Sequence, residues 1–272
     1  MDTPSCDGSR LLALVEPLID EGRLVAARHM LNAALALTPS GAHSWEIEAR
    51  LLLLEGSIGD ALLLLDQAVA HAPDALAARL RRSSARMKKG DQHGALLDAA
   101  ECVLQAPGVP FPKALLGVLL WQADRSPEAL SCLRDAVASN PADPGFLQAL
   151  ASVQDCLGNT ADAAATLAQG IARMPEHVGL RNSAILLCMR SENMNEAQRL
   201  ASAACDEGVC DSDTFTMLGD ALASQSDSPA AARAYEESTK LRPGTISHDV
   251  SSLTHGSVGA YRRPAFASMS AA

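Results

Sequence analysis

Residues 42–75 read AHSWEIEARLLLLEGSIGDALLLLDQAVAHAPDA, and this stretch decides the fold. Gly56 divides it into two apolar halves, and a glycine there supplies the positive φ angle with which a helix often ends. Pro73 ends the second half, because proline cannot donate the next helical hydrogen bond. The stretch therefore predicts two helices joined by a tight turn.

The landmarks of this stretch recur every 34 residues in both directions along the chain. A repeat of this length cannot bury its apolar face alone, so its stability comes from stacking on its neighbours. The 34-residue spacing is kept by seven alanines: Ala27, Ala61, Ala95, Ala129, Ala163, Ala197 and Ala231. Prolines keep it at Pro39, Pro73, Pro107, Pro141, Pro175 and Pro243, and Val209 occupies the remaining proline position.

The period and the residues at fixed positions resemble the tetratricopeptide repeat. Trp45, Ala49, Gly56 and Ala61 match its signature in the stretch quoted above, and Leu-Gly pairs stand at 116–117 and 218–219. The resemblance implies an all-α solenoid of seven helix-turn-helix units that forms a right-handed superhelix, with the first helix of each unit lining a concave groove. The predicted blocks are 8–41, 42–75, 76–109, 110–143, 144–177, 178–211 and 212–245, with a flexible N-terminus at 1–7 and a largely disordered tail at 246–272.

Three blocks depart from the pattern in ways that bear on packing. The eighth position is small in most blocks, which lets the two helices approach closely, but it is Val15 in the first block and Ile185 in the sixth. The third block places Arg79, Arg82 and Arg86 at positions that normally face the core. Either this helix is rotated, or the guanidinium groups reach outward along their apolar stems.

Composition and charge exclude several classes of partner. A formal net charge of −10 and a pI of about 5.1 argue against nucleic-acid binding, because nucleic acid is a polyanion. No segment has the roughly 18 consecutive apolar residues of a membrane span, and the polar N-terminus MDTPSCDGSR lacks the features of a signal peptide. We therefore expect a cytoplasmic protein with no nucleic-acid or membrane partner.

Sequence motifs of catalysis are missing. The chain has no G-x-x-x-x-G-K-[ST], H-E-x-x-H or G-x-S-x-G, and its histidines are not paired at metal-ligand spacing. We therefore expect no enzyme activity, no cofactor, no metal and no small-molecule substrate. Most of the cysteines are interpreted as small buried apolar residues. For the close pair Cys205 and Cys210, a redox or metal couple is the alternative.

The family resemblance also implies a binding surface, because positions 2, 5, 6, 9, 12 and 13 of each first helix face the groove in tetratricopeptide repeats. Carried over to blocks 2 to 4, these positions include Arg50, Arg81, Lys88, Phe111 and Trp121. Basic and aromatic side chains together favour another protein or peptide as partner, with an acidic segment as the specific expectation. The alternative is that the charges form a solvated face and that Phe111 only packs against the helix start.

A second resemblance suggests a different role. The stretches LVEPLIDEGRL (14–24), KALLGVLL (113–120) and LRNSAILLC (180–188) resemble the helical part of bacterial proteins that fuse such repeats to an S-adenosylmethionine-dependent methyltransferase. This resemblance implies, as the alternative function, a substrate- or partner-recruiting part of such an enzyme. No strand followed by an acidic, glycine-rich loop occurs in the 272 residues, so the catalytic domain is expected to be absent from this chain.

Overall fold

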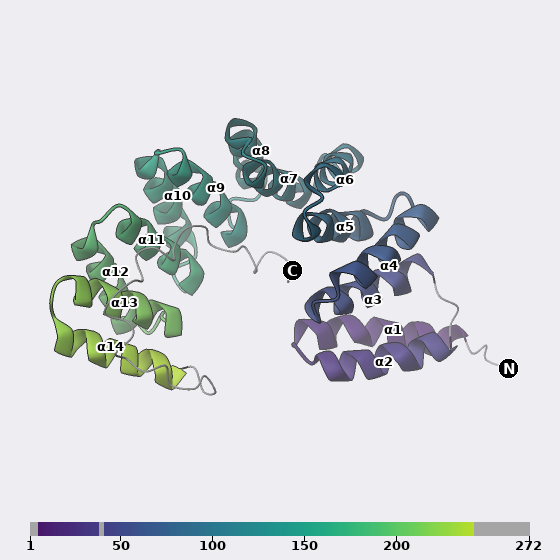
Figure 1. Cartoon of the computed structure of the whole chain (residues 1–272), viewed down its shortest axis with the longest axis horizontal. Helices are drawn as coiled ribbons and strands as arrows, with labels where there is room; N and C mark the ends of the chain where they lie inside the picture. The colour runs from purple at the N-terminus through teal and green to yellow at the C-terminus, as the bar shows by residue number, and fades with distance from the viewer. Residues whose placement is uncertain (1–4, 38–40, 242–272) are drawn as a thin grey trace. The chain divides into compact units, whose positions relative to one another are not determined.

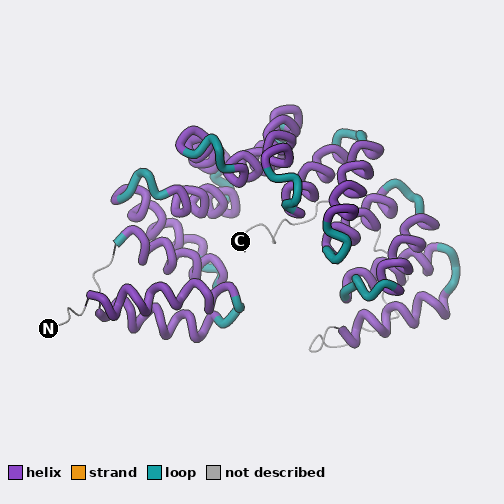
Figure 2. The backbone as a smooth tube through the Cα atoms, turned by 180° about the vertical axis from the view of Figure 1, so that it is seen from behind, coloured by secondary structure: helices purple, strands orange, loops and turns teal. Residues whose placement is uncertain are grey.

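The computed structural model describes residues 5–37 and 41–241, and within these ranges every regular element is an α-helix (Figures 1 and 2). The predicted all-α fold is therefore confirmed. Fourteen helices follow one another in this part of the chain: α1 Ser5–Asp20, α2 Leu24–Leu37, α3 Ala42–Leu54, α4 Ile58–His71, α5 Leu76–Lys89, α6 Gln92–Gln105, α7 Pro110–Gln122, α8 Ser126–Ser139, α9 Pro144–Cys156, α10 Thr160–Arg173, α11 Val178–Arg190, α12 Met194–Asp206, α13 Ser212–Ser224 and α14 Ser228–Leu241.

The helices form sequential pairs, and each predicted 34-residue block contains one pair. α1 begins at Ser5, inside the segment 1–7 that was expected to be flexible. The predicted tail, 246–272, lies outside the described residues. The handedness of the superhelix and the block boundaries stay predictions.

The chain divides into two compact units, and the division falls within α8, after Ala136. In the first unit the helices pack as the pairs α1–α2, α3–α4 and α5–α6, and each pair contacts the next through α2 and α3, α4 and α5, or α6 and α7. In the second unit α10 contacts α11 and α12 contacts α13 in the same way. Within each unit the pairs stack in chain order, which confirms the predicted helix-turn-helix solenoid architecture.

Position 15 of every block adopts the left-handed conformation that turns the chain from the first helix to the second. Glycine meets this requirement in four blocks, as expected, because it has no Cβ atom. The other three blocks meet it with a larger residue at φ of 60° to 65°. These three residues are Asp124, Glu192 and Ser226.

The two helices of a block cross where position 8 meets position 24, and in the fourth and sixth blocks a small residue at one position accompanies a larger residue at the other. A Cβ atom added to Gly117 would lie 2.7 Å from Cγ of Leu133. In the sixth block the large Ile185 is fully buried in a cluster that contains the small Ala201. Position 8 can therefore hold a large residue when the residue at position 24 is small.

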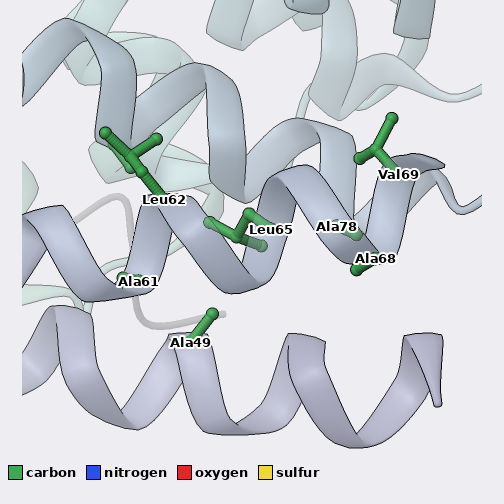
Figure 3. Close-up of a cluster of buried hydrophobic side chains, with 8 residues drawn as sticks. Ala49, Ala61, Leu62, Leu65, Ala68, Val69 and Ala78 are labelled. Atoms are coloured by element: carbon green, nitrogen blue, oxygen red, sulfur yellow. The ribbon is translucent and has the colours of Figure 1, made fainter. Parts of the chain in front are cut away.

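The second block shows the usual form of this crossing. Figure 3 shows Ala49 on α3 facing Ala61 and Leu65 on α4, and all three are fully buried. Ala78 of α5 joins the same cluster, so the second helix of one block and the first helix of the next share one core. This sharing is the reason that a single block would expose apolar surface.

The arginines of the third block neither rotate their helix outward nor reach into solvent. Arg82 Nη2 and Nε bond to the two carboxylate oxygens of Asp98 on α6 at 2.6 and 2.8 Å, and Arg86 Nη1 bonds to Asp98 at 2.9 Å. Asp66 on α4 accepts from the same two arginines at 3.0 and 3.2 Å. Burial lowers the pKa of Arg82, but its bonds to Asp98 and Asp66 outweigh this and raise the pKa above its ordinary value. We call these four residues the interhelix ion network.

The prolines that mark the period also serve as acceptors. The carbonyl oxygen of Pro73 accepts from Arg79 Nη2 at 2.5 Å and from Gln105 Nε2 at 3.2 Å, both in the next block. Pro141 accepts from Arg173 Nη1 at 3.3 Å in the same register. The loop between blocks is thus held by side chains as well as by the end of the helix.

Candidate partner-binding surface

The residues expected to bind a partner lie on the first helices of blocks 2, 3 and 4, all within the first unit. Arg50 is on α3, Arg81 and Lys88 are on α5, and Phe111 and Trp121 are at the two ends of α7. In this part of the chain α1 contacts α3, and α3 contacts α5. We call the five residues on α3, α5 and α7, together with their exposed neighbours on these helices, the first-helix surface.

Arg50 is nine-tenths buried, with 8% of its surface exposed. Its Nη2 atom forms an ion pair with Asp20, the last residue of α1, whose side chain is 59% exposed. Its Nε–H is buried and has no acceptor within the described part of the chain. A buried donor without a partner costs free energy of about 1–3 kcal/mol, and an incoming acceptor would recover part of it.

Arg81 is also paired within the first-helix surface. Its Nε donates to Glu46 on α3, and the Glu46 side chain is only 9% exposed. His43, one turn earlier on α3, lies 3.8 Å from the other carboxylate oxygen of Glu46. The charges of Arg50 and Arg81 are therefore compensated by carboxylates, so the basic character expected from the sequence is weaker than the count of arginines indicates.

The three remaining residues differ in exposure. Lys88 is exposed at the end of α5 and forms no ion pair with the described residues. Phe111 and Trp121 are half-buried on α7. Lys88 thus supplies accessible positive charge, and the two rings supply partly exposed aromatic surface.

The sequence reasoning missed the acidic partners Asp20 and Glu46. The signal was present, because Glu46 and Arg81 are 35 residues apart, one period plus one position. Asp155 and Arg190 have the same separation in the second unit and lie 2.9 Å apart. A search for opposite charges at this separation would have found both pairs.

The second unit carries a polar counterpart on α9, α11 and α13. Gln148 Nε2 donates to Ser183 Oγ at 2.9 Å, again across 35 residues. Asn182 Nδ2 donates to Asp211 at 3.1 Å, and the Thr214 hydroxyl donates to Asn182 at 2.7 Å. Burial would raise the pKa of Asp211, but hydrogen bonds from Thr214 and Asn182 outweigh it and lower the pKa. First helices in both units are therefore joined by polar side chains.

Within residues 5–37 and 41–241 no group of three or more His, Cys, Asp or Glu is placed to hold a metal ion. Over the same ranges, no helix combines the length and the apolar character needed to cross a membrane. Burial raises the pKa of the Cys102 thiol to about 11. A thiol with so high a pKa is a poor nucleophile at neutral pH.

Comparison with known proteins places the chain in one family of repeats. A family model described as tetratricopeptide repeat matches residues 12–75 and 115–175. No curated protein matches the sequence. The family model describes only the repeat. The link to a methyltransferase therefore stays a prediction.

Solved structures share the fold at low sequence identity. A tetratricopeptide repeat protein from Parabacteroides merdae is 16% identical with a TM-score of 0.66, and the alignment covers 88% of this chain and 94% of that one. The Cut9–Hcn1 hetero-tetramer of the APC/C is 15% identical with a TM-score of 0.65, covering 85% of this chain and 46% of that one. A thermophilic tetratricopeptide repeat protein from Thermus thermophilus is 22% identical with a TM-score of 0.56, covering 67% of this chain and 99% of that one.

The matched residues, the helix pairs at a 34-residue spacing and the shared fold agree with one another. The chain is a tetratricopeptide repeat protein, a member of a family whose domains commonly mediate protein–protein interactions.

Proposed function

We propose that this protein is a scaffold that binds a segment of another protein on the first-helix surface of α3, α5 and α7. The observation that carries the proposal is Arg50. Its guanidinium is held in place by Asp20, while its Nε–H is buried and has no acceptor in the described part of the chain. A donor that is fixed and unsatisfied is suited to a carbonyl or carboxylate oxygen of a partner.

Partly exposed apolar side chains lie on the same helix as this donor and on α7, two blocks further along the chain. Leu54 follows Arg50 by one helical turn on α3 and is 45% exposed. Phe111 and Trp121 add half-buried rings on α7. A partner segment that covers these side chains would bury apolar area, and one of its oxygens would accept a hydrogen bond from Arg50 Nε–H. Protein interfaces usually combine these two kinds of contact.

Charge favours an acidic segment as the partner. Lys88 and its neighbour Lys89 are exposed, and neither forms an ion pair with the described residues. Exposed charges of this kind mainly speed association, and their effect weakens as salt rises. The proposed ligand is therefore an acidic peptide segment whose main chain or carboxylate reaches Arg50.

The test begins with peptides selected on the full chain from a random display library, followed by titration of a selected peptide against variants. Arg50→Lys keeps the positive charge beside Asp20 but removes Nε–H, and we expect about a fivefold weaker affinity from the loss of one hydrogen bond. Trp121→Ala should cost about 2 kcal/mol or more if the ring anchors the peptide. Lys88→Glu with Lys89→Glu should slow association at low salt.

The matched control for charge is Arg134→Glu, an exposed arginine on α8, outside the first-helix surface. It should leave the affinity unchanged, and circular dichroism should show all variants folded. Selected peptides that bind all variants equally well would place the binding site elsewhere and overturn the proposal.

A further inference from the structure

A pocket lies at the edge of the first unit, where α4 and α6 end and α5 begins. It has a volume of about 410 Å³ and is lined by Pro73, Asp74, Leu76, Gln105 and Ala106. The first three of these residues belong to the connection between α4 and α5 and to the start of α5, and the last two end α6. A volume of this size is within the range of ligand pockets in proteins.

Hydrogen bonds hold the walls of this pocket in place. The carbonyl oxygen of Pro73 accepts from Gln105 Nε2 at 3.2 Å, which joins the two sides, and from Arg79 Nη2 at 2.5 Å. The amide of Ala106 donates to the carbonyl of Cys102 at 3.0 Å and so fixes the last turn of α6. The pocket is therefore formed before a ligand arrives, and binding loses less free energy in ordering it.

The pocket and its rim offer apolar surface. Pro73, Leu76 and Ala106 contribute apolar side chains to the lining. Leu104, directly before Gln105 on α6, is 75% exposed. Such a surface suits a side chain with a long aliphatic stem, together with an apolar residue beside it.

The accessible charge at the pocket is negative. Asp74 is exposed and forms no ion pair with the described residues. Glu101, one turn before Gln105, accepts from Gln105 Nε2 at 3.4 Å, and its side chain is 51% exposed. Arg79 lies 3.4 Å from Glu101 but is nine-tenths buried. Two helices end beside the pocket and one begins there, so the helix dipoles add net negative potential.

We propose that this pocket binds an arginine side chain of a partner protein, within a segment that carries an apolar residue next to the arginine. The aliphatic stem lies over Leu76 and Ala106, and the guanidinium group pairs with Asp74 and Glu101. The apolar neighbour covers Leu104. Arginine fits better than lysine because its planar guanidinium group donates to two carboxylates at once.

This site is separate from the first-helix surface and favours the opposite charge. Leu76 begins α5, whereas Lys88 is in its last turn, about 18 Å further along the helix at about 1.5 Å per residue. An acidic segment is proposed for the lysine end, and a basic segment for the pocket. The inference therefore does not rest on the function proposed above.

The probe for this site is the tripeptide Leu-Arg-Leu with both ends blocked, titrated into the isotope-labelled full chain and followed by NMR. We expect shifts of the amide signals from the pocket lining, namely Asp74, Leu76, Gln105 and Ala106. The same peptide with citrulline in place of arginine keeps the shape but not the charge. It should bind about fivefold more weakly, because it loses its ion pairs with two exposed carboxylates.

Surface variants identify the contacts without disturbing the core. Asp74→Asn and Glu101→Gln should each weaken binding of the arginine peptide about threefold. Leu104→Ser should also weaken it, because the apolar neighbour loses its contact. Asp60→Asn is the matched control, since Asp60 is an exposed acid in the first turn of α4, at the far end of that helix from the pocket. It should leave the affinity unchanged.

Three results would overturn the proposal. One is equal affinity for the arginine and citrulline peptides, and another is a set of shifts confined to residues outside the pocket. The third is unchanged affinity of Asp74→Asn for the arginine peptide. Loss of acidic-peptide binding at the first-helix surface would not alter these measurements, so the two proposals fail separately.

Discussion

Glu46 on α3 and Arg81 on α5 form an ion pair across 35 residues of sequence, one repeat period plus one position. Gln148 and Ser183 form a hydrogen bond at the same separation on α9 and α11. In both cases the fifth position of one block meets the sixth position of the next. Polar side chains thus fix one first helix against its neighbour, in addition to the apolar core shared with the second helices.

Reversing the charge of Arg81 should destabilise the first unit. In Arg81→Glu the Glu46 carboxylate, whose side chain is 9% exposed, would face a like charge in place of its partner. We expect a loss of about 2–3 kcal/mol, as for other partly buried pairs that lose one member. Lys88→Glu, seven residues further along α5, is the control and should change stability by no more than about 0.5 kcal/mol. Denaturant unfolding of both variants measures the difference, and equal stability would mean that the pair contributes nothing.

Replacing the non-glycine residues at position 15 should stabilise the protein. Asp124, Glu192 and Ser226 have φ angles of 60° to 65°, where a Cβ atom crowds the backbone. Each change to glycine should raise the free energy of unfolding by about 0.5–1 kcal/mol, since the relief of strain exceeds the entropy cost of glycine. Gly158→Ala, at a φ of 80°, is the converse change and should destabilise. Thermal unfolding of each variant measures the change in stability. A lower melting temperature for all three glycine variants would contradict the idea that these residues are strained.

Adding a methyl group at a tight crossing should be costly. A Cβ atom on Gly219 would lie 2.5 Å from Cε1 of Tyr235, which is too close without movement of the ring. Gly219→Ala should therefore destabilise the second unit by about 1–3 kcal/mol. Gly59→Ala on α4 is the matched control, because nothing lies within 4 Å of the added atom and alanine favours the helix. Gly59→Ala should be neutral or stabilising in the same melts.

Removing the central carboxylate of the interhelix ion network should be among the most destabilising single changes. Asp98 is 5% exposed and bonds to both Arg82 and Arg86. Asp98→Asn removes the shared buried carboxylate and leaves Arg82 with Asp66, and Arg86 with Asp66 and the longer 3.8 Å contact to Asp91. We expect a loss of about 3–5 kcal/mol.

The control for Asp98→Asn is Glu101→Gln, one turn further along α6. Glu101 is 51% exposed and lies 3.4 Å from Arg79, so its pair is exposed to solvent on one side. Its loss should cost no more than about 1 kcal/mol. Comparable losses for the two variants would show that burial does not set the strength of these pairs.

The sequence predicted the helix pairs well because their determinants lie within one block. Ala49, Ala61 and Pro73 each act on their own turn or on the adjoining helix, and the period repeats their effect. The left-handed turn was also predictable, although not the residue that occupies it at Asp124. Every block requires the left-handed conformation at position 15, and a glycine there only lowers the free-energy cost of adopting it.

Polar contacts could not be predicted in the same way, since their partners lie on other helices. Arg82 was interpreted from its own helix, whereas Asp98 is 16 residues away on α6. Arg50 was expected to present free positive charge, and Asp20 lies 30 residues before it. Single-helix reasoning identifies which face a side chain occupies, but the charge of that face depends on what the neighbouring block brings to it.

The interhelix ion network has a consequence for how this array can evolve. Repeat arrays can lengthen or shorten by whole blocks, because each repeat contacts only its neighbours. Asp66 belongs to the block 42–75, whereas its partners Arg82 and Arg86 belong to 76–109. Recombination that parts these two blocks would deprive Arg82 and Arg86 of the Asp66 carboxylate, so selection should keep the two blocks together as a single heritable pair.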